Sequence, residues 1–106
     1  MTPTLLDIVT AHIGLRQSHD RRPWLVIEIR PSRRYLLLPI SSATDLFDRI
    51  QHFPLDPRHP DFPATGLTKT SYIIGNNAVE NDGSAFDERL GCLQGNLAKE
   101  FIEWFG

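Results

Sequence analysis

The sequence predicts a mainly β protein: a small antiparallel β-barrel, closed or half closed, with two or three short helices that include a C-terminal one. Three observations support this fold class. Apolar runs rich in branched residues alternate with turn residues, two of these runs are joined by a very short turn, and the last ten residues show helical spacing. A chain of 106 residues suits one domain with one core, so we expect a single domain over 1–106.

The expected strands follow from the apolar runs and the turns between them. Pro23 has no N–H to donate to a sheet and suits the first position of a strand. The short turn Pro31-Ser32-Arg33 joins two runs as an antiparallel hairpin, and Asn76-Asn77 offers another tight turn. Residues 81–84 are also predicted to form a turn. The sequence therefore predicts strands over 5–13, 24–30, 34–40, 70–75 and 78–80.

Two segments have the pattern of helices. Residues 42–45 resemble a capping box with Asp in place of Glu, which predicts a short helix to about Ile50. Leu97, Phe101, Ile102 and Phe105 fall at helical spacing and predict an amphipathic helix over 96–105. Between the two, residues 52–66 contain four prolines and are predicted to form an extended surface excursion and no helix.

The charge of the chain is unevenly distributed. The net charge is -2, yet residues 1–42 carry +3 and residues 43–106 carry -5. The basic part can bind a polyanion, or its arginines can simply keep strand edges soluble. We expect no membrane span and no signal peptide, because no apolar run approaches ~18 residues and no basic region precedes one. A single cysteine forms no internal disulfide, which fits a reducing cytoplasm.

Several kinds of catalytic site are not indicated. The four histidines and one cysteine lack the spacing of metal ligands, so neither a metal nor another cofactor is expected. His12 is interpreted as a structural residue within a strand, and Cys92 as an inert thiol of the core. The sequence has no Gly-x-Ser-x-Gly elbow and no glycine-rich phosphate loop.

The remaining candidates for a functional site are an arginine and a serine at the ends of predicted strands. Arg22 precedes the second predicted strand and Ser41 ends the third. An arginine stabilises charge on a phosphoryl group, and a hydroxyl adds a hydrogen bond without a metal. Judged on local sequence alone, the favoured interpretation is a loop arginine and a serine at a helix N-cap, with Ser42 as the cap.

Five segments of the chain resemble the PemK/MazF toxin family, the ribosome-independent endoribonucleases of bacterial toxin–antitoxin systems. Each segment is a weak motif alone, but the five occur in the family's order and span nearly the whole chain. They are Asp7-Ile8-Val9, Arg21-Arg22-Pro23-Trp24-Leu25-Val26, Leu38-Pro39-Ile40-Ser41-Ser42, Gly66-Leu67-Thr68-Lys69-Thr70-Ser71-Tyr72-Ile73 and Arg89-Leu90-Gly91-Cys92-Leu93.

The resemblance implies an SH3-like barrel, a homodimer and metal-independent cleavage of single-stranded RNA by the RNA's own 2′-hydroxyl. It places Arg22 on the scissile phosphate and in proton transfer, and Ser41 on the phosphate or the developing charge. It further implies a cognate antitoxin as partner and a cytoplasmic location. The residues expected to contact RNA are Arg16, Arg21, Arg33, Arg34, Ser42 and Lys69, with simple edge charges as the alternative for Arg33 and Arg34 and a helix cap for Ser42.

The chain differs from the family pattern at five places, one of which is the loop over 14–20, where the usual Gly-Ser-rich stretch is missing. Ser41 stands for a threonine, Leu6 for a glycine before Asp7, and Cys92 for a frequent arginine. Gln94-Gly95-Asn96 replaces the serine cap of the last helix. Two other functions are compatible with the same scaffold. One is a gyrase-poisoning toxin of the CcdB type, loosely echoed by residues 33–39 and by the tail with Trp104, and the other is a catalytically inactive barrel.

Overall fold

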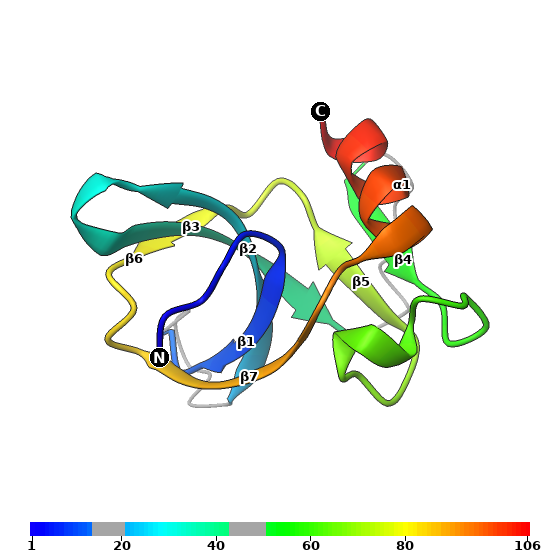
Figure 1. Cartoon of the computed structure of the whole chain (residues 1–106), viewed down its shortest axis with the longest axis horizontal. Coiled ribbons are helices and arrows are strands. Elements are labelled where there is room, and N and C mark those ends of the chain that lie inside the picture. The colour runs from blue at the N-terminus through cyan, green and yellow to red at the C-terminus, as the bar shows by residue number, and fades with distance from the viewer. Residues whose placement is uncertain (14–20, 43–50) are drawn as a thin grey trace.

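The computed structural model of the chain describes residues 1–13, 21–42 and 51–106. Strands dominate these ranges, as predicted, and one α-helix follows them at the C-terminus (Figure 1). The strands are β1 (Asp7–Ala11), β2 (Arg22–Arg30), β3 (Arg34–Ser41), β4 (His52–Leu55), β5 (Ser71–Ile74), β6 (Val79–Asn81) and β7 (Phe86–Cys92). The helices are α1 (Gly95–Phe105) and the 3-10 turns η1 (Pro31–Arg33) and η2 (Pro63–Thr65). Of the predicted helix over 42–50, residues 43–50 lie outside the described residues.

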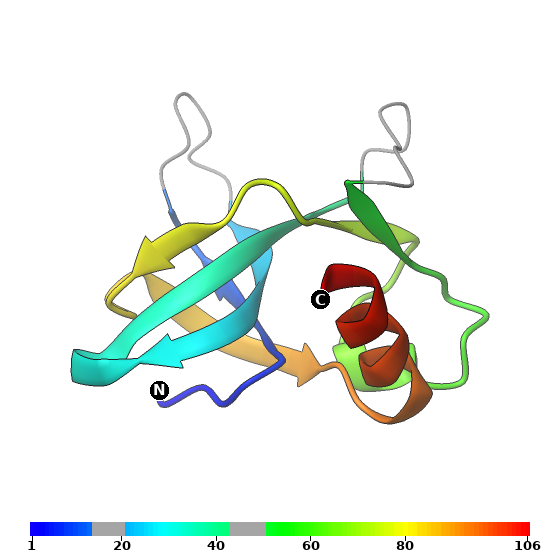
Figure 2. The same cartoon turned by 90° about the horizontal axis from the view of Figure 1, so that it is seen from above.

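The strands form one antiparallel sheet in the order β4-β5-β3-β2-β1-β7, and β6 pairs with β3. The long strand β3 is shared, because residues 35–37 pair with β6 and Ile40 and Ser41 pair with β5. Figure 2 shows the sheet curling around its own interior, with α1 packed at the end that holds β4 and β5. The mainly β class is confirmed, but the ladder between the described strands is open, with β4 and β7 as its ends.

Both faces of the central strands are buried, which explains why β2 and β3 read as continuous apolar runs. Neighbouring residues such as Trp24 and Leu25 point to opposite faces, and both are 0–1% exposed. One face packs a smaller core against β6 and β7. This core consists of Val9, Ala11, Trp24, Val26, Tyr35 and Leu37.

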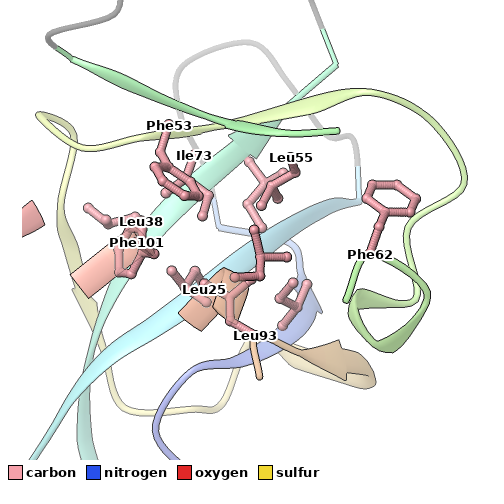
Figure 3. Close-up of a cluster of buried hydrophobic side chains, with 11 residues drawn as sticks. Leu25, Leu38, Phe53, Leu55, Phe62, Ile73, Leu93 and Phe101 are labelled. Carbon is pink, nitrogen blue, oxygen red and sulfur yellow. The ribbon is translucent and has the colours of Figure 1, made fainter. Parts of the chain in front are cut away.

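The opposite face carries the larger core, which holds α1 onto the sheet (Figure 3). Phe101 of α1 is 2% exposed and meets Phe53 of β4 edge to face, with the ring centroids 5.5 Å apart. Of the predicted apolar face of α1, Leu97 and Phe101 are buried, whereas Ile102 and Phe105 are 56% and 44% exposed. Trp104 also packs against Phe53 and Phe101, with ring centroids 5.5 and 6.0 Å away, and the partly exposed ring of Phe105 stacks on Phe101.

The predictions for two strands were incomplete. Residues 52–66 were expected to be an extended excursion, yet β4 occupies 52–55 and η2 occupies 63–65. Pro54 is tolerated in β4 because this strand is an edge of the sheet and the proline is exposed. Strand β7 was not predicted at all. It too is an edge strand, so its charged residues 87–89 reach solvent and mask the alternation.

The first strand is shorter than predicted. It begins at Asp7, because Leu5 and Leu6 form a turn in which Leu6 has a φ of +67°. It ends at Ala11, so His12 lies beyond the strand as an exposed residue, with its Nε2 4.0 Å from the carboxylate of Asp87. His12 is therefore not a structural residue within a strand. The predicted hairpin of β2 and β3 is confirmed.

Helix α1 is capped from outside its own sequence. Gln94 at the N-cap makes no side-chain cap bond. Instead, Oδ2 of Asp61 accepts hydrogen bonds from the backbone N–H groups of Asn96 and Leu97, at 3.0 and 3.3 Å. A carboxylate at this end also interacts favourably with the helix dipole. Asp61 therefore caps the helix in place of the serine that the segment 94–96 lacks. Among the described residues, no helix has the length and apolar character needed to cross a membrane.

Candidate functional site

A hollow of about 250 Å³ lies where β2 begins and β3 ends. Its wall combines the start of the Arg-Pro segment, the hydroxyls that follow β3 and the loop before β5. The lining residues are Arg21, Arg22, Pro23, Ile40, Ser41, Ser42, Leu67, Thr68, Lys69 and Ser71. Five of the eight predicted site residues are thus brought together: the proposed catalytic pair Arg22 and Ser41, and also Arg21, Ser42 and Lys69.

The register of the β2–β3 hairpin explains why Arg22 and Ser41 meet. Trp24 faces Pro39 and Leu25 faces Leu38. Trp24 and Pro39 are the last pair at this end of the hairpin, and Arg22 and Ser41 each lie two residues beyond it, where both line the hollow. Arg22 is held from the other side as well, because it pairs with Ala11 of β1. The pair therefore sits on backbone fixed by neighbouring strands, although Ser41 is the last residue of its own strand.

The second wall of the hollow depends on a close approach between η2 and β7. Gly66 has a φ of +74°, and a Cβ there would lie 2.1 Å from the carbonyl oxygen of Leu90. A Cβ on Gly91 would lie equally close, 2.1 Å, to the carbonyl oxygen of Ala64. Only glycine fits at either position. This contact fixes where the chain continues into residues 67–69 and hence where Lys69 reaches the hollow.

The two arginines at the hollow differ in their electrostatic partners. Arg21 contacts Asp87 and Glu88 at 2.7 and 2.8 Å, so β7 neutralises its charge. The guanidinium of half-buried Arg22 has no hydrogen bond or ion pair to any described residue, and the ammonium group of exposed Lys69 has none either. No described carboxylate lines the hollow. A half-buried cation without a counter-charge and beside a serine hydroxyl is an arrangement that accepts an anion such as a phosphate.

Arg33 and Arg34 are not part of this arrangement. They lie at the other end of the hairpin, which projects away from α1 in Figure 1. From Arg22 to Arg30 at the tip, β2 extends over about 26 Å at the usual rise per residue. Arg34 and Arg30 both bind Glu80, at 2.7 and 2.6 Å, and the Arg34 guanidinium lowers the pKa of that carboxyl. Arg16 lies outside the described residues.

Pro23, Ile40, Leu67, Thr68 and Ser71 also line the hollow but were not singled out as site residues. Ser71 is 4% exposed, and its Oγ donates a hydrogen bond to the carbonyl oxygen of Lys69, 3.0 Å away. All five lie in segments that carry the family resemblance: Pro23 in 21–26, Ile40 in 38–42, and the other three in 66–73.

Two further interpretations concern metal ligands and the thiol. In the part of the chain that the structure describes, no group of three His, Cys, Asp or Glu side chains is placed to hold a metal ion. Cys92 was expected in the core, but it ends β7 as a half-buried residue with its Sγ 3.9 Å from Oε1 of Gln94. The core position belongs to the next residue, Leu93, which is 4% exposed.

Comparisons with known proteins identify the fold. No family model and no curated protein matches the sequence. Among solved structures, the chain is similar to the Mycobacterium tuberculosis toxin MazF-mt6, with a TM-score of 0.68 and 17% identity over 94% of this chain and 92% of that one. It is also similar to an endoribonuclease in complex with its cognate antitoxin from a mycobacterial species, with a TM-score of 0.65 and 12% identity over 97% and 88%. The chain therefore has the fold of the MazF toxins.

Proposed function

We propose that the chain is a MazF-like endoribonuclease, the toxin of a toxin–antitoxin pair, which cleaves single-stranded RNA in the cytoplasm as a homodimer and without a metal. The observation that carries the proposal is the environment of Arg22. This guanidinium has no described counter-charge and lines the same hollow as Ser41, and the resemblance carries the family's catalytic pair over to these two residues. The fold shared with an endoribonuclease supports the same conclusion.

The chemistry needs no nucleophile from the protein. The 2′-oxygen of the RNA forms a bond to phosphorus while the bond from phosphorus to the 5′-oxygen breaks. One proton leaves the 2′-hydroxyl and another reaches the 5′-oxygen, which yields a cyclic phosphate and a free 5′-hydroxyl. Arg22 donates hydrogen bonds to the phosphoryl oxygens as their negative charge grows, and the Ser41 hydroxyl adds another. Lys69 holds the backbone near the hollow as a point charge.

The proposed antitoxin would act on the same surface. A small partner with an acidic, disordered tail would fold over the hollow, supply the counter-charge that Arg22 lacks and exclude RNA. The mycobacterial relative was solved in complex with its cognate antitoxin, which supports such a partner. A gene for a small acidic protein directly upstream of this one is the expected arrangement.

The test compares two arginines that have no described ion pair. Arg22→Gln removes the guanidinium at the hollow, and Arg33→Gln removes one at the hairpin tip. The two sites lie about 26 Å apart along the strand, well beyond the Debye length of about 10 Å in 0.1 M salt. Purified protein in EDTA is mixed with single-stranded RNAs of varied sequence. We expect Arg22→Gln to slow cleavage by at least about 10²-fold, and Arg33→Gln to leave it almost unchanged.

The outcomes separate the competing functions. Intact RNA in the presence of folded wild-type protein, across the varied sequences, would refute the ribonuclease proposal. Equal losses in the two variants would show that charge in general matters, and that the hollow does not. Capture of gyrase that depends on Trp104 would instead favour the CcdB-type function. In the structure, however, that ring lies in contact with Phe53 and Phe101.

A further inference from the structure

The hollow at Arg22 and Ser41 continues along the outer face of the sheet. Ser41 also lines a second hollow of about 230 Å³, together with His52 and Tyr72. His52 and Tyr72 in turn line a third and wider hollow of about 620 Å³, beside Trp104. Each hollow shares residues with the next, so the three are neighbours along β3, β5 and β4, and we call this row of hollows the path.

The sheet register places this path on one face. Ser41 pairs with Tyr72, and Tyr72 pairs with Pro54. Residues directly opposite each other project their side chains to the same side, and adjacent strands lie about 4.8 Å apart. The ring of Tyr72 is therefore one strand away from the proposed catalytic hydroxyl. His52 lies two residues before Pro54 in β4 and shares this face.

Buried neighbours anchor the backbone beneath the path in the core. Tyr72 is half-buried between Ser71 and Ile73, which are 4% and 0% exposed, and His52 precedes Phe53, which is 8% exposed. The inward residues thus anchor both strands in the larger core. An aromatic ring on such a strand is held in position before any ligand arrives, so little conformational entropy is lost on binding.

The polarity of the second hollow suits an unpaired base of a nucleic acid. Besides the two rings and Ser41, it is lined by the amides Gln51, Asn76 and Asn77 and by Ile74. Asn76 donates a hydrogen bond to Oε1 of Gln51, 2.9 Å away. No described carboxylate borders this hollow, so nothing described there repels a polyanion. Aromatic rings beside amide groups are the surroundings in which proteins bind unpaired bases, by stacking and by hydrogen bonds to the base edges.

We propose that Tyr72 is a stacking platform for the base of the nucleotide next to the scissile phosphate, with His52 flanking the same base. This inference rests on the proposed ribonuclease function and names the positioning residue of its substrate. It makes an unpaired nucleotide a requirement of binding, because a base within a duplex cannot leave its own stack to reach the ring. The phosphate is held by Arg22 and Ser41, and the base is held one strand away.

The first experiment measures binding and not cleavage. A single-stranded oligonucleotide with 2′-O-methyl groups throughout cannot be cleaved, and its affinity is followed by fluorescence anisotropy. Tyr72→Leu is expected to weaken binding by about 5- to 100-fold, the range of one lost base stack. Tyr72→Phe keeps the ring without the hydroxyl and should bind like the wild type. Placing an abasic site beside the cleavage position should weaken the wild type, but not Tyr72→Leu.

A second measurement uses the composition of the chain. It has two tyrosines, and the other, Tyr35, is 4% exposed in the smaller core. With both rings isotopically labelled, addition of the oligonucleotide should shift the Tyr72 ring signals upfield and leave those of Tyr35 in place. This readout does not depend on the stability of any variant.

The results distinguish the two proposals. If wild-type protein cleaves RNA, but Tyr72→Leu binds as tightly and the Tyr72 signals do not move, the stacking platform is wrong and the ribonuclease stands. If the wild type neither cleaves RNA nor binds the uncleavable strand, both are wrong. If Tyr72→Leu binds duplex and single strands with equally reduced affinity, the ring supports the fold and reads no base, which also overturns the platform.

Discussion

Leu6 is held in a backbone conformation that favours glycine, and this leads to a prediction about stability. Its φ is +67°, where a Cβ is crowded against the following carbonyl. The strands leave it no alternative, because its N–H donates to the carbonyl oxygen of Val26 at 2.8 Å and its own carbonyl oxygen accepts from Leu93 N–H at 2.9 Å. The family that the chain resembles has glycine at this position.

The relevant comparison is between two truncations, Leu6→Ala and Leu6→Gly. Both remove the same half-buried side chain from the larger core, so the lost packing largely cancels between them. Alanine keeps the crowded Cβ, which costs about 1–2 kcal/mol in this region. Glycine removes it but loses about 0.5–1 kcal/mol through greater freedom of the unfolded chain. We therefore expect the glycine variant to be more stable by about 0.5–1 kcal/mol.

The neighbouring Leu5 provides the control, since it is an exposed leucine of the same turn without a positive φ. There alanine should be the more stable replacement, by about 0.5–1 kcal/mol. Urea unfolding followed by tryptophan fluorescence measures all four variants, and 1 kcal/mol corresponds to a midpoint shift of about 0.3–1 M. If Leu6→Ala proves as stable as Leu6→Gly or more so, the strain attributed to this φ is absent.

Three other changes test the cap, the site and a surface carboxylate. Asp61→Ala should lower the free energy of unfolding, measured by urea titration, by about 1 kcal/mol because Asn96 N–H loses its acceptor. Asp61→Asn should keep most of the stability, and equal losses in the two variants would argue against capping. Ser41→Ala should slow single-turnover RNA cleavage by about 10²-fold, and Ser41→Thr should restore it; an active alanine variant would remove the hydroxyl from the mechanism. The hydrogen bonds from Arg58 lower the pKa of Asp56 from 3.8 to about 2. Any stability from this pair is therefore present above pH 3.8 and lost as the pH falls through about 2. An NMR titration should show that Arg58→Ala raises the Asp56 midpoint, and an unchanged midpoint would refute the cause.

Elements stabilised by local pattern could be predicted from the sequence. The runs in β2 and β3 are apolar on both faces, so burial on either side gives the same prediction of a strand. The hairpin followed from its short turn, and α1 from its spacing. Edge strands could not be predicted in this way. The alternation of apolar and polar residues is obscured by Pro54 in β4 and by the charged residues 87–89 in β7. Edge strands tolerate a proline or a run of charges that a central strand would exclude.

By itself, the sequence determined the mainly β class and the hairpin, because apolar runs and a short turn are local patterns, and its resemblance to the PemK/MazF family supplied the proposed pairing of Arg22 with Ser41. Only the tertiary structure decided which basic residues share a surface with that pair. Arg21 is neutralised by strand β7, which is distant in sequence, and Lys69 is brought in by the contact of Gly66 with Leu90. Tyr72 likewise reaches Ser41 through a strand pairing that no local pattern encodes, since pairing between distant strands depends on how the whole core packs.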